Sequence, residues 1–118
     1  MADRPTDCLF CKIRDGQIPA KKVYEDERCF AFRDIQPQAP THILVCPRTH
    51  VPTLNDLAAE QEALAGHLLV VGARLAKDEG FADGGWRAVF NVNADAGQLV
   101  FHIHLHVLGG RTFDWPPG

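Results

Sequence analysis

The 118-residue sequence lacks the features that mark several large classes of protein. No apolar run approaches the roughly 18 residues that a membrane-spanning helix needs. Residues 1–6 are polar and lack the apolar core of a signal peptide, so we expect a cytoplasmic protein with no membrane partner. Lys and Arg never cluster, and 12 of them stand against 15 Asp and Glu, giving a net charge of −3. Because duplex binding needs a basic surface, nucleic acid is not an expected partner.

Length and composition predict one compact domain. Domains cluster near about 100–150 residues, so a chain of 118 residues has no room for a second core. A content of 46% hydrophobic and 23% charged residues argues against a disordered chain. We therefore expect a single domain over residues 1–118, in which residues 7–110 form the core and residues 111–118 form a tail.

Short β-prone runs are separated by turn residues along much of the chain. They cover residues 22–25, 29–34, 42–46, 86–92 and 100–108. Apolar residues at three- to four-residue steps predict one long helix over 56–79, with Thr53 or Asp56 as its cap and Gly80 beyond its end. Because the helix stands only between the third and fourth strands, we expect an α+β fold, with a five-stranded antiparallel sheet carrying the helix on one face.

Three histidines alternate with apolar residues in the last predicted strand. Since side chains alternate faces along a strand, His102, His104 and His106 would share one face. A solvent-facing strand more often carries Lys, Glu or Thr, so the pattern favours a chemical role. The outer two backbones stand about 13 Å apart, too far for their rings to converge easily on one metal ion. A phosphate group fits better, because one imidazole can attack phosphorus while the next donates a hydrogen bond to an oxygen.

The segment HIHLHVL at 102–108 resembles the signature of the histidine triad superfamily. Further matches are similar to its nucleotide-binding (Hint) branch: GQ at 97–98, LGGR at 108–111 and WPPG at 115–118. Others are IPA at 18–20, FRDI at 32–35 and PQAPTH at 37–42. The resemblance therefore covers nearly the whole chain.

This resemblance implies a purine nucleoside phosphoramidase or nucleotidyl hydrolase acting at the α-phosphate. His104 would form a covalent nucleotidyl intermediate, His106 would contact the phosphate, and His42 would support the triad by hydrogen bonding. Asp34 would accept hydrogen bonds from the ribose; the alternative role for this residue is capping of a turn. The other expected substrate-binding residues are Asn91, Gly97, Gln98, Leu99 and Trp115, together with an apolar purine slot of Leu9, Phe10, Ile13, Phe32, Ile35 and Leu44, each of which could instead be core.

Leu99 departs from the pattern of that branch. The branch commonly has a serine there, near the leaving group, whereas leucine can neither donate a hydrogen bond nor shuttle a proton. Slower turnover or a different leaving group would follow. Leu99 is the main support for one alternative, a nucleotide- and zinc-binding adaptor with little turnover. Among enzymes, the nearest rival is a dinucleoside polyphosphate hydrolase, against which the GG at 109–110 and the WPPG ending argue by resemblance.

The four cysteines separate into two kinds. Cys8 and Cys11 have the spacing of a metal knuckle, and His50 with His102 would complete a structural Cys₂His₂ zinc site, an arrangement similar to that of some members of the superfamily. The alternative is a pair of free thiols. Cys29 and Cys46 lie within apolar strand patterns and are expected to be small buried hydrophobes.

A homodimer is also implied by the resemblance. Two five-stranded sheets would continue into one sheet of ten strands, with the long helices packed together. The tail carrying Trp115 would then be able to reach the partner's site.

Overall fold

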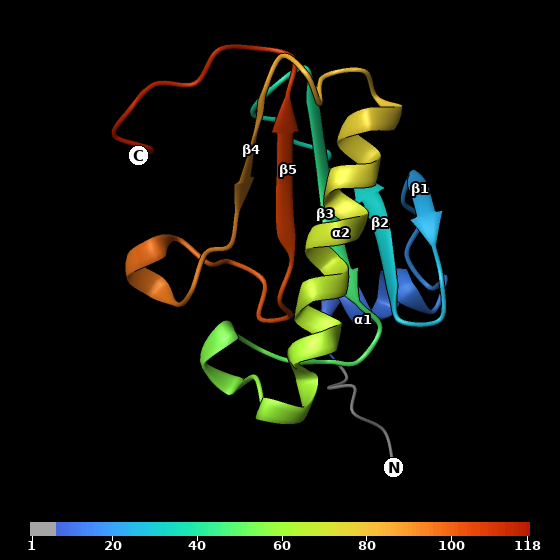
Figure 1. The fold of residues 1–118 in the computed structure, drawn as a ribbon. Coiled ribbons are helices and arrows are strands. Elements are labelled where there is room, and N and C mark those ends of the chain that lie inside the picture. The colour runs from blue at the N-terminus through green and yellow to red at the C-terminus, as the bar shows by residue number, and fades with distance from the viewer. Residues whose placement is uncertain (1–6) are drawn as a thin grey trace.

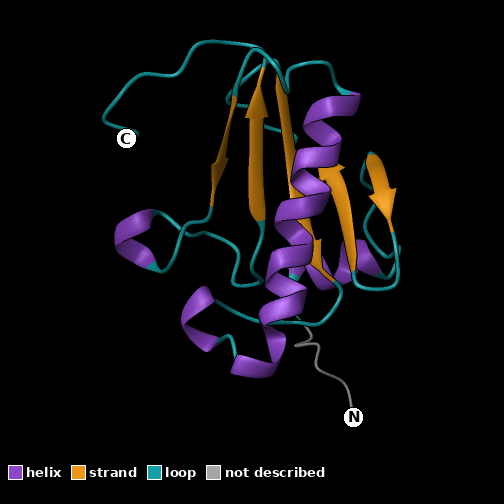
Figure 2. Cartoon of the chain, in the orientation of Figure 1, coloured by secondary structure: helices purple, strands orange, loops and turns teal. Residues whose placement is uncertain are grey.

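The computed structural model describes residues 7–118, so the expectation for residues 1–6 lies outside the described part. Its strands form one antiparallel sheet in the order β1-β2-β3-β5-β4 (Figure 1). The strands are β1 (Lys22–Glu25), β2 (Cys29–Arg33), β3 (Thr41–Pro47), β4 (Trp86–Val89) and β5 (Leu105–Gly109). This confirms the predicted α+β fold with a five-stranded antiparallel sheet. The residues after Gly110 form neither helix nor strand (Figure 2).

The long helix α2 (Glu62–Asp78) begins six residues later than predicted. Two short 3₁₀ turns, η1 (Leu54–Asp56) and η2 (Ala59–Gln61), occupy the preceding segment. The Thr53 hydroxyl accepts a hydrogen bond from the Asn55 amide and caps η1, not α2. Gly80 lies beyond the end of α2 with φ of +91°, which glycine adopts without steric cost, as predicted.

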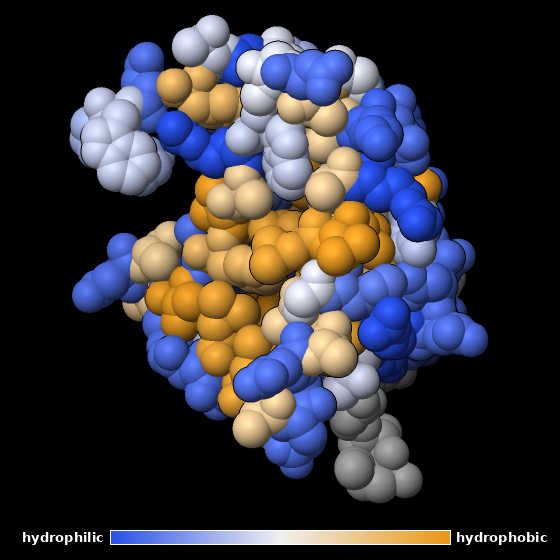
Figure 3. Space-filling view, viewed as in Figure 1, coloured by the Kyte–Doolittle hydropathy of each residue, from blue (hydrophilic) through white to orange (hydrophobic). Residues whose placement is uncertain are grey.

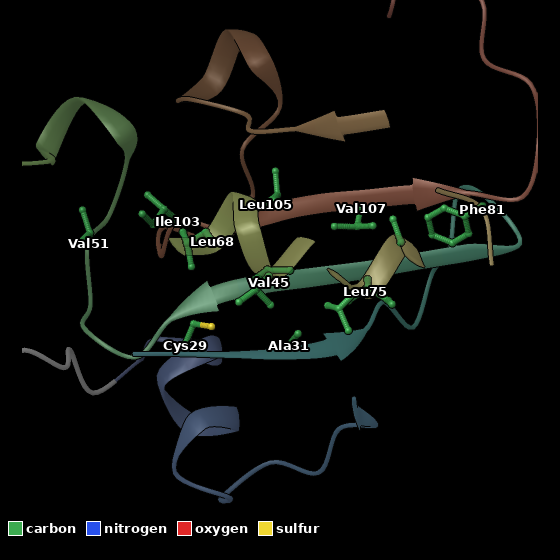
Figure 4. Close-up of a cluster of buried hydrophobic side chains, with 13 residues drawn as sticks. Cys29, Ala31, Val45, Val51, Leu68, Leu75, Phe81, Ile103, Leu105 and Val107 are labelled. Carbon is green, nitrogen blue, oxygen red and sulfur yellow. The ribbon is translucent and has the colours of Figure 1, made fainter. Parts of the chain in front are cut away.

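The α2 face of the sheet forms a closed apolar core. Gly72 allows the helix to approach closely, because a Cβ atom there would lie 2.9 Å from Cδ2 of Leu105. The buried side chains around this contact include Cys29, Ala31, Ile43, Val45, Leu68, Val71, Leu75, Leu105 and Val107 (Figure 4). On the outside, apolar surface gathers over the middle of the face on which α2 lies (Figure 3).

The opposite face is covered by a short helix that the sequence patterns did not predict, α1 (Leu9–Arg14). Its Phe10, Cys11 and Ile13 are buried against Phe30, Phe32, Leu44 and Cys46. With six residues α1 is too short to show amphipathic periodicity, and its cap is the Cys8 sulfur, which accepts from the Cys11 amide at 3.2 Å. Cys29 and Cys46 are fully buried free thiols on opposite faces, as predicted.

The predicted last strand is shorter than expected at its beginning. His106 lies in β5, but His102 and His104 precede it in irregular chain. The reason is a change of backbone partner: the Ile103 amide donates to the Val51 carbonyl at 2.8 Å, outside the sheet. β4 likewise ends at Val89, so Asn91 follows that strand instead of lying on it. Within residues 7–118, no helix has the length and apolar character to cross a membrane.

Candidate active site and metal centre

A cavity of about 500 Å³ opens on the α1 face of the sheet. Its apolar walls come from α1, β2 and β3, and its polar side comes from the turn after β2 and the chain around β5. The expected site residues that line it are Leu9, Phe10, Ile13, Phe32, Asp34, Ile35, His42, Leu44, Asn91, Gly97, Leu99, His104 and His106. Residues spread over almost one hundred positions of sequence therefore meet around one hollow of ligand size.

His104 presents one bare ring nitrogen at this cavity. Its Nδ1 lies 2.8 Å from the backbone carbonyl of His102. A carbonyl oxygen only accepts hydrogen bonds, so Nδ1 carries the proton and Nε2 of the neutral ring carries the lone pair. Burial lowers the pKa of His104 below its usual 6.5 and keeps the ring neutral. Phe10 meets the same ring edge-on at 4.9 Å between centroids and limits its movement.

His42 and His106 form a hydrogen-bonded chain beside it. The Gln38 amide donates to Nδ1 of His42 at 3.1 Å, so the proton of the neutral His42 ring is on Nε2. That Nε2 lies 2.9 Å from Nδ1 of His106 and donates to it. The proton of His106 is therefore on its own Nε2. Burial is the main cause that lowers the pKa of His42, and it lowers the pKa of His106 to about 4.

The last ring nitrogen in this series of hydrogen bonds is Nε2 of His106, and it has no partner among the described residues. Nε2 of His106 is buried and makes no hydrogen bond to any residue within 7–118. An unsatisfied buried donor costs roughly 1–3 kcal/mol, so such groups are uncommon in folded proteins. Because His106 lines the cavity, an acceptor on a bound ligand is the natural partner for this N–H.

Asp34 lies in the turn that follows β2 and uses its two oxygens differently. Oδ1 accepts a hydrogen bond from the Gln36 amide at 2.9 Å and stabilises the turn. Oδ2 lies 3.5 Å from Nε2 of His42. The carboxylate also lines the cavity and can accept further hydrogen bonds there. Asp34 therefore caps the turn, the alternative role expected from the sequence, and still has carboxylate oxygens at the cavity.

Cys8, Cys11, His50 and His102 gather next to the cavity. One potential ligand atom from each lies within 4.8 Å of the others, so the group can hold a metal ion. Nε2 of His102 donates to the Pro47 carbonyl at 2.8 Å, which leaves Nδ1 as the ligating nitrogen. Burial lowers the pKa of His102 to about 4, so its ring is neutral. The row of three histidines is thus divided: the first ring faces this cluster and the other two face the cavity.

Comparison with known proteins decides the family. The HIT domain matches residues 15–113 of the chain. The chain belongs to the HIT family. The purine nucleoside phosphoramidase of Escherichia coli is 49% identical over 105 residues, which cover 89% of this chain and 88% of that protein.

Solved structures agree with this assignment. A HIT family hydrolase from Legionella pneumophila has a TM-score of 0.93 at 53% identity, with 95% of this chain and 100% of that chain covered. A histidine triad nucleotide-binding protein from Candida albicans has a TM-score of 0.81 at 30% identity, with coverage of 93% and 83%.

Two expected site residues of this HIT domain do not line the cavity. Gln98 is buried, and its amide ties the loop together: Oε1 accepts from the Asn93 amide at 2.9 Å, and Nε2 donates to the Pro52 carbonyl at 2.8 Å. Trp115 is exposed in the tail, away from the lining of this chain's own cavity. The amide of Gln98 is thus satisfied by its neighbours and positions the loop beside the cavity.

Other lining residues of the HIT cavity were not singled out from the sequence. They are Ile18, Pro19, Ala20, Arg33, Gln36, Gln38 and Val100. Most stand in or beside the matched segments 18–20, 32–35 and 37–42, which is the signal that could have found them. The backbone amide of Gln38, which sets the tautomer of His42, has no side-chain signature and needs the structure to be found.

Proposed function

We propose that this HIT protein hydrolyses purine nucleoside phosphoramidates at the α-phosphate through a nucleotidyl-His104 intermediate. The observation that carries the proposal is a pair of neighbouring rings with opposite roles, 4.9 Å apart between centroids. His104 offers a bare Nε2 to the cavity, and His106 offers an unsatisfied Nε2–H. A nucleophile beside a hydrogen-bond donor suits attack on phosphorus with stabilisation of a phosphoryl oxygen. The name of the Escherichia coli relative supports this substrate class.

The cavity offers separate places for the parts of a nucleotide. The purine would lie against the apolar side chains of Phe10, Ile13, Phe32 and Leu44, all of which are buried. The ribose hydroxyls would donate to Asp34, whose carboxylate also lines the cavity. The phosphate would then lie at His104 and His106, and Asn91 and Gly97 line the same cavity.

Each step of the proposed reaction balances in protons and electron pairs. Nε2 of His104 attacks phosphorus, and the P–N bond breaks with its electron pair on the amine, which takes a proton from water. Nδ1–H of His104 still donates to the His102 carbonyl and so supports the positive ring. Water then attacks phosphorus, and the bond between phosphorus and Nε2 of His104 breaks with its electron pair on Nε2. The attacking water loses one proton, which replaces the proton that the amine took from water in the first step. The products are a nucleoside monophosphate and an amine.

We propose zinc as the occupant of the cysteine–histidine cluster. In a tetrahedron with Zn–S of about 2.3 Å and Zn–N of about 2.0–2.1 Å, a nitrogen and a sulfur stand about 3.5 Å apart and two nitrogens about 3.3 Å apart. The Cys8 and Cys11 sulfurs lie 3.4 and 3.5 Å from Nδ1 of His102, and the Cys11 sulfur lies 3.5 Å from Nδ1 of His50. The two Nδ1 atoms lie 3.2 Å apart. The donor set therefore fits zinc, which would hold α1 and His102 in place as a structural ion.

We also propose a homodimer through the β4 edge and α2. β4 is an edge strand with one unpaired side, and Leu69 and Val70 of α2 are exposed. Pairing two β4 strands about a two-fold axis would extend the sheet and bury these side chains.

Mass spectrometry of acid-quenched protein tests the proposed intermediate directly. After mixing with adenosine 5′-phosphoramidate, we expect wild-type protein to gain the mass of one adenylyl group. His104→Ala should show neither adduct nor turnover, while His67→Asn, whose ring faces Asp26 outside the cavity, should keep both. Turnover by His104→Ala at the wild-type rate would refute the mechanism. Nucleotide binding by the wild type without any adduct would favour the adaptor.

A further inference from the structure

A second hollow of about 360 Å³ lies beside the 500 Å³ cavity, which we call the nucleotide cavity after its proposed ligand. The two hollows share the side chains of Leu9, Leu99 and Val100, so these three residues form a common rim. We call the second hollow the rim groove. It is lined by Asp7, Cys8, Leu9, His50, Pro52, Leu99, Val100 and Phe101.

The rim groove carries large apolar side chains that are left open to solvent. The exposed fraction is 91% for Leu99, 46% for Phe101 and 41% for Leu9. Single exposed apolar residues are common on protein surfaces, but these three line one hollow that adjoins a binding site. Covering them with an apolar group would be favourable at roughly 25 cal/mol per Å² of buried apolar area.

The charges of the lining residues limit which groups can bind over these apolar side chains. Among the lining residues that the structure describes, within 7–118, Asp7 is the sole carboxylate, and none is a Lys or an Arg. A polyphosphate chain would bring negative charge next to Asp7 without a cation to offset it. A neutral apolar group meets no such opposition. The groove therefore disfavours the second nucleotide of a dinucleoside polyphosphate.

The order of groups along the proposed substrate identifies the part that can reach the rim groove. In the proposed function the nucleoside fills the wall between Asp34 and the apolar slot, and phosphorus lies at His104. The group that leaves phosphorus must extend elsewhere, and the rim of Leu99 and Val100 connects the nucleotide cavity to another hollow. Leu99 offers that group contact area where a hydroxyl would offer a hydrogen bond.

We propose that the rim groove binds the leaving group of the substrate and selects apolar, especially aromatic, amines. This inference rests on the proposed phosphoramidase function and adds the class of amine to it. Binding energy gained on a remote part of a substrate raises kcat/KM when the contact persists in the transition state. One phenyl ring resting on Leu99 and Phe101 should favour an aromatic amine about tenfold over a polar amine of similar basicity.

Two adenosine 5′-phosphoramidates test this: one made with benzylamine and one made with ethanolamine. The readout is the ratio of their kcat/KM values, benzylamine over ethanolamine. We expect a ratio of about ten for the wild type, falling to about one in Leu99→Ser and in Phe101→Ser. Leu99→Met keeps the apolar bulk and should keep the ratio within about twofold. Because Leu99 is 91% exposed, its variants should fold normally. Phe101 is 46% exposed, so circular dichroism should accompany the kinetics of Phe101→Ser.

Ile35→Ser is the matched control, because Ile35 is an equally exposed apolar residue that lines the nucleotide cavity but not the rim groove. It should change both substrates alike and leave the ratio unchanged. Hydrolysis of both substrates with a ratio insensitive to Leu99→Ser and Phe101→Ser would overturn the groove assignment. A ratio that responds to Trp115→Ala instead would overturn it in favour of the tail. Hydrolysis of neither substrate by the wild type would overturn the proposed function itself.

Discussion

The two faces of the sheet are built on different principles. One is covered by the 17-residue α2 and is filled by apolar side chains such as Leu68, Val71 and Leu75. The other is covered by the six-residue α1 and holds the 500 Å³ cavity, the hydrogen-bonded histidines and the cysteine–histidine cluster. A long amphipathic helix closes a face by burial alone. A short helix cannot, so it leaves a hollow and needs additional anchors.

The largest expected effect is loss of stability from a cavity on the α2 face. Leu68 is fully buried in the α2 core, so Leu68→Ala should lower the free energy of unfolding by about 3 kcal/mol. Urea denaturation followed by circular dichroism measures this, at a temperature where the variant is still folded. Leu69→Ala, one residue further along α2 and exposed, is the matched control and should change stability by less than about 1 kcal/mol. Equal losses in both variants would contradict the closed-core description.

The next largest expected effect is a loss of activity on the α1 face, where His42 positions His106. His42→Ala removes the donor that sets the tautomer of His106 and should lower kcat about a hundredfold, with a smaller change in KM. His42→Gln keeps an N–H donor and should recover part of the loss. Steady-state kinetics on adenosine 5′-phosphoramidate measures both. A change confined to KM, or no recovery by glutamine, would mean that His42 does not act through His106.

Metal removal should loosen α1 and leave α2 unchanged. Elemental analysis should find about one zinc per chain in the wild type and none in Cys11→Ser, whereas Cys46→Ala should keep the metal. Because α1 carries Phe10 and Ile13 of the cavity wall, Cys11→Ser should also bind AMP about tenfold more weakly. Hydrogen exchange should speed up at α1 amides and around His50 and His102, and should not change in α2. Full zinc content in Cys11→Ser would rule out the proposed ligand set.

The smallest effect is a displaced pH profile. Burial disfavours the charged ring, so the pKa of His104 lies below 6.5 and the nucleophile stays neutral as the pH falls through that value. The acid limb of log kcat/KM against pH, measured between pH 4.5 and 8, should therefore have its midpoint below 6.5. The buried rings also bind fewer protons than the unfolded chain does, so stability should fall as the pH drops below 6.5. A midpoint at or above 6.5 would contradict the buried neutral His104.

Local sequence patterns determined the parts of this protein that depend on neighbours along the chain. Short β-prone runs bounded by turn residues predicted the five strands, and the spacing of Leu64, Leu68, Val71 and Leu75 predicted α2. Burial of Cys29 and Cys46 followed from their places in apolar strand runs. These features are set by the period of the backbone, which is the same in every protein.

Tertiary structure alone decided the parts that depend on distant partners. α1 has no periodicity to detect, and its cap is a cysteine sulfur. His102 and His104 lie outside the strand because Ile103 pairs with Val51, half a chain away. The protonated nitrogen of each active-site ring is set by the Gln38 amide and the His102 carbonyl, two backbone groups with no signature in the sequence. A sequence names the imidazoles, but only the fold brings each nitrogen to the partner that fixes its proton.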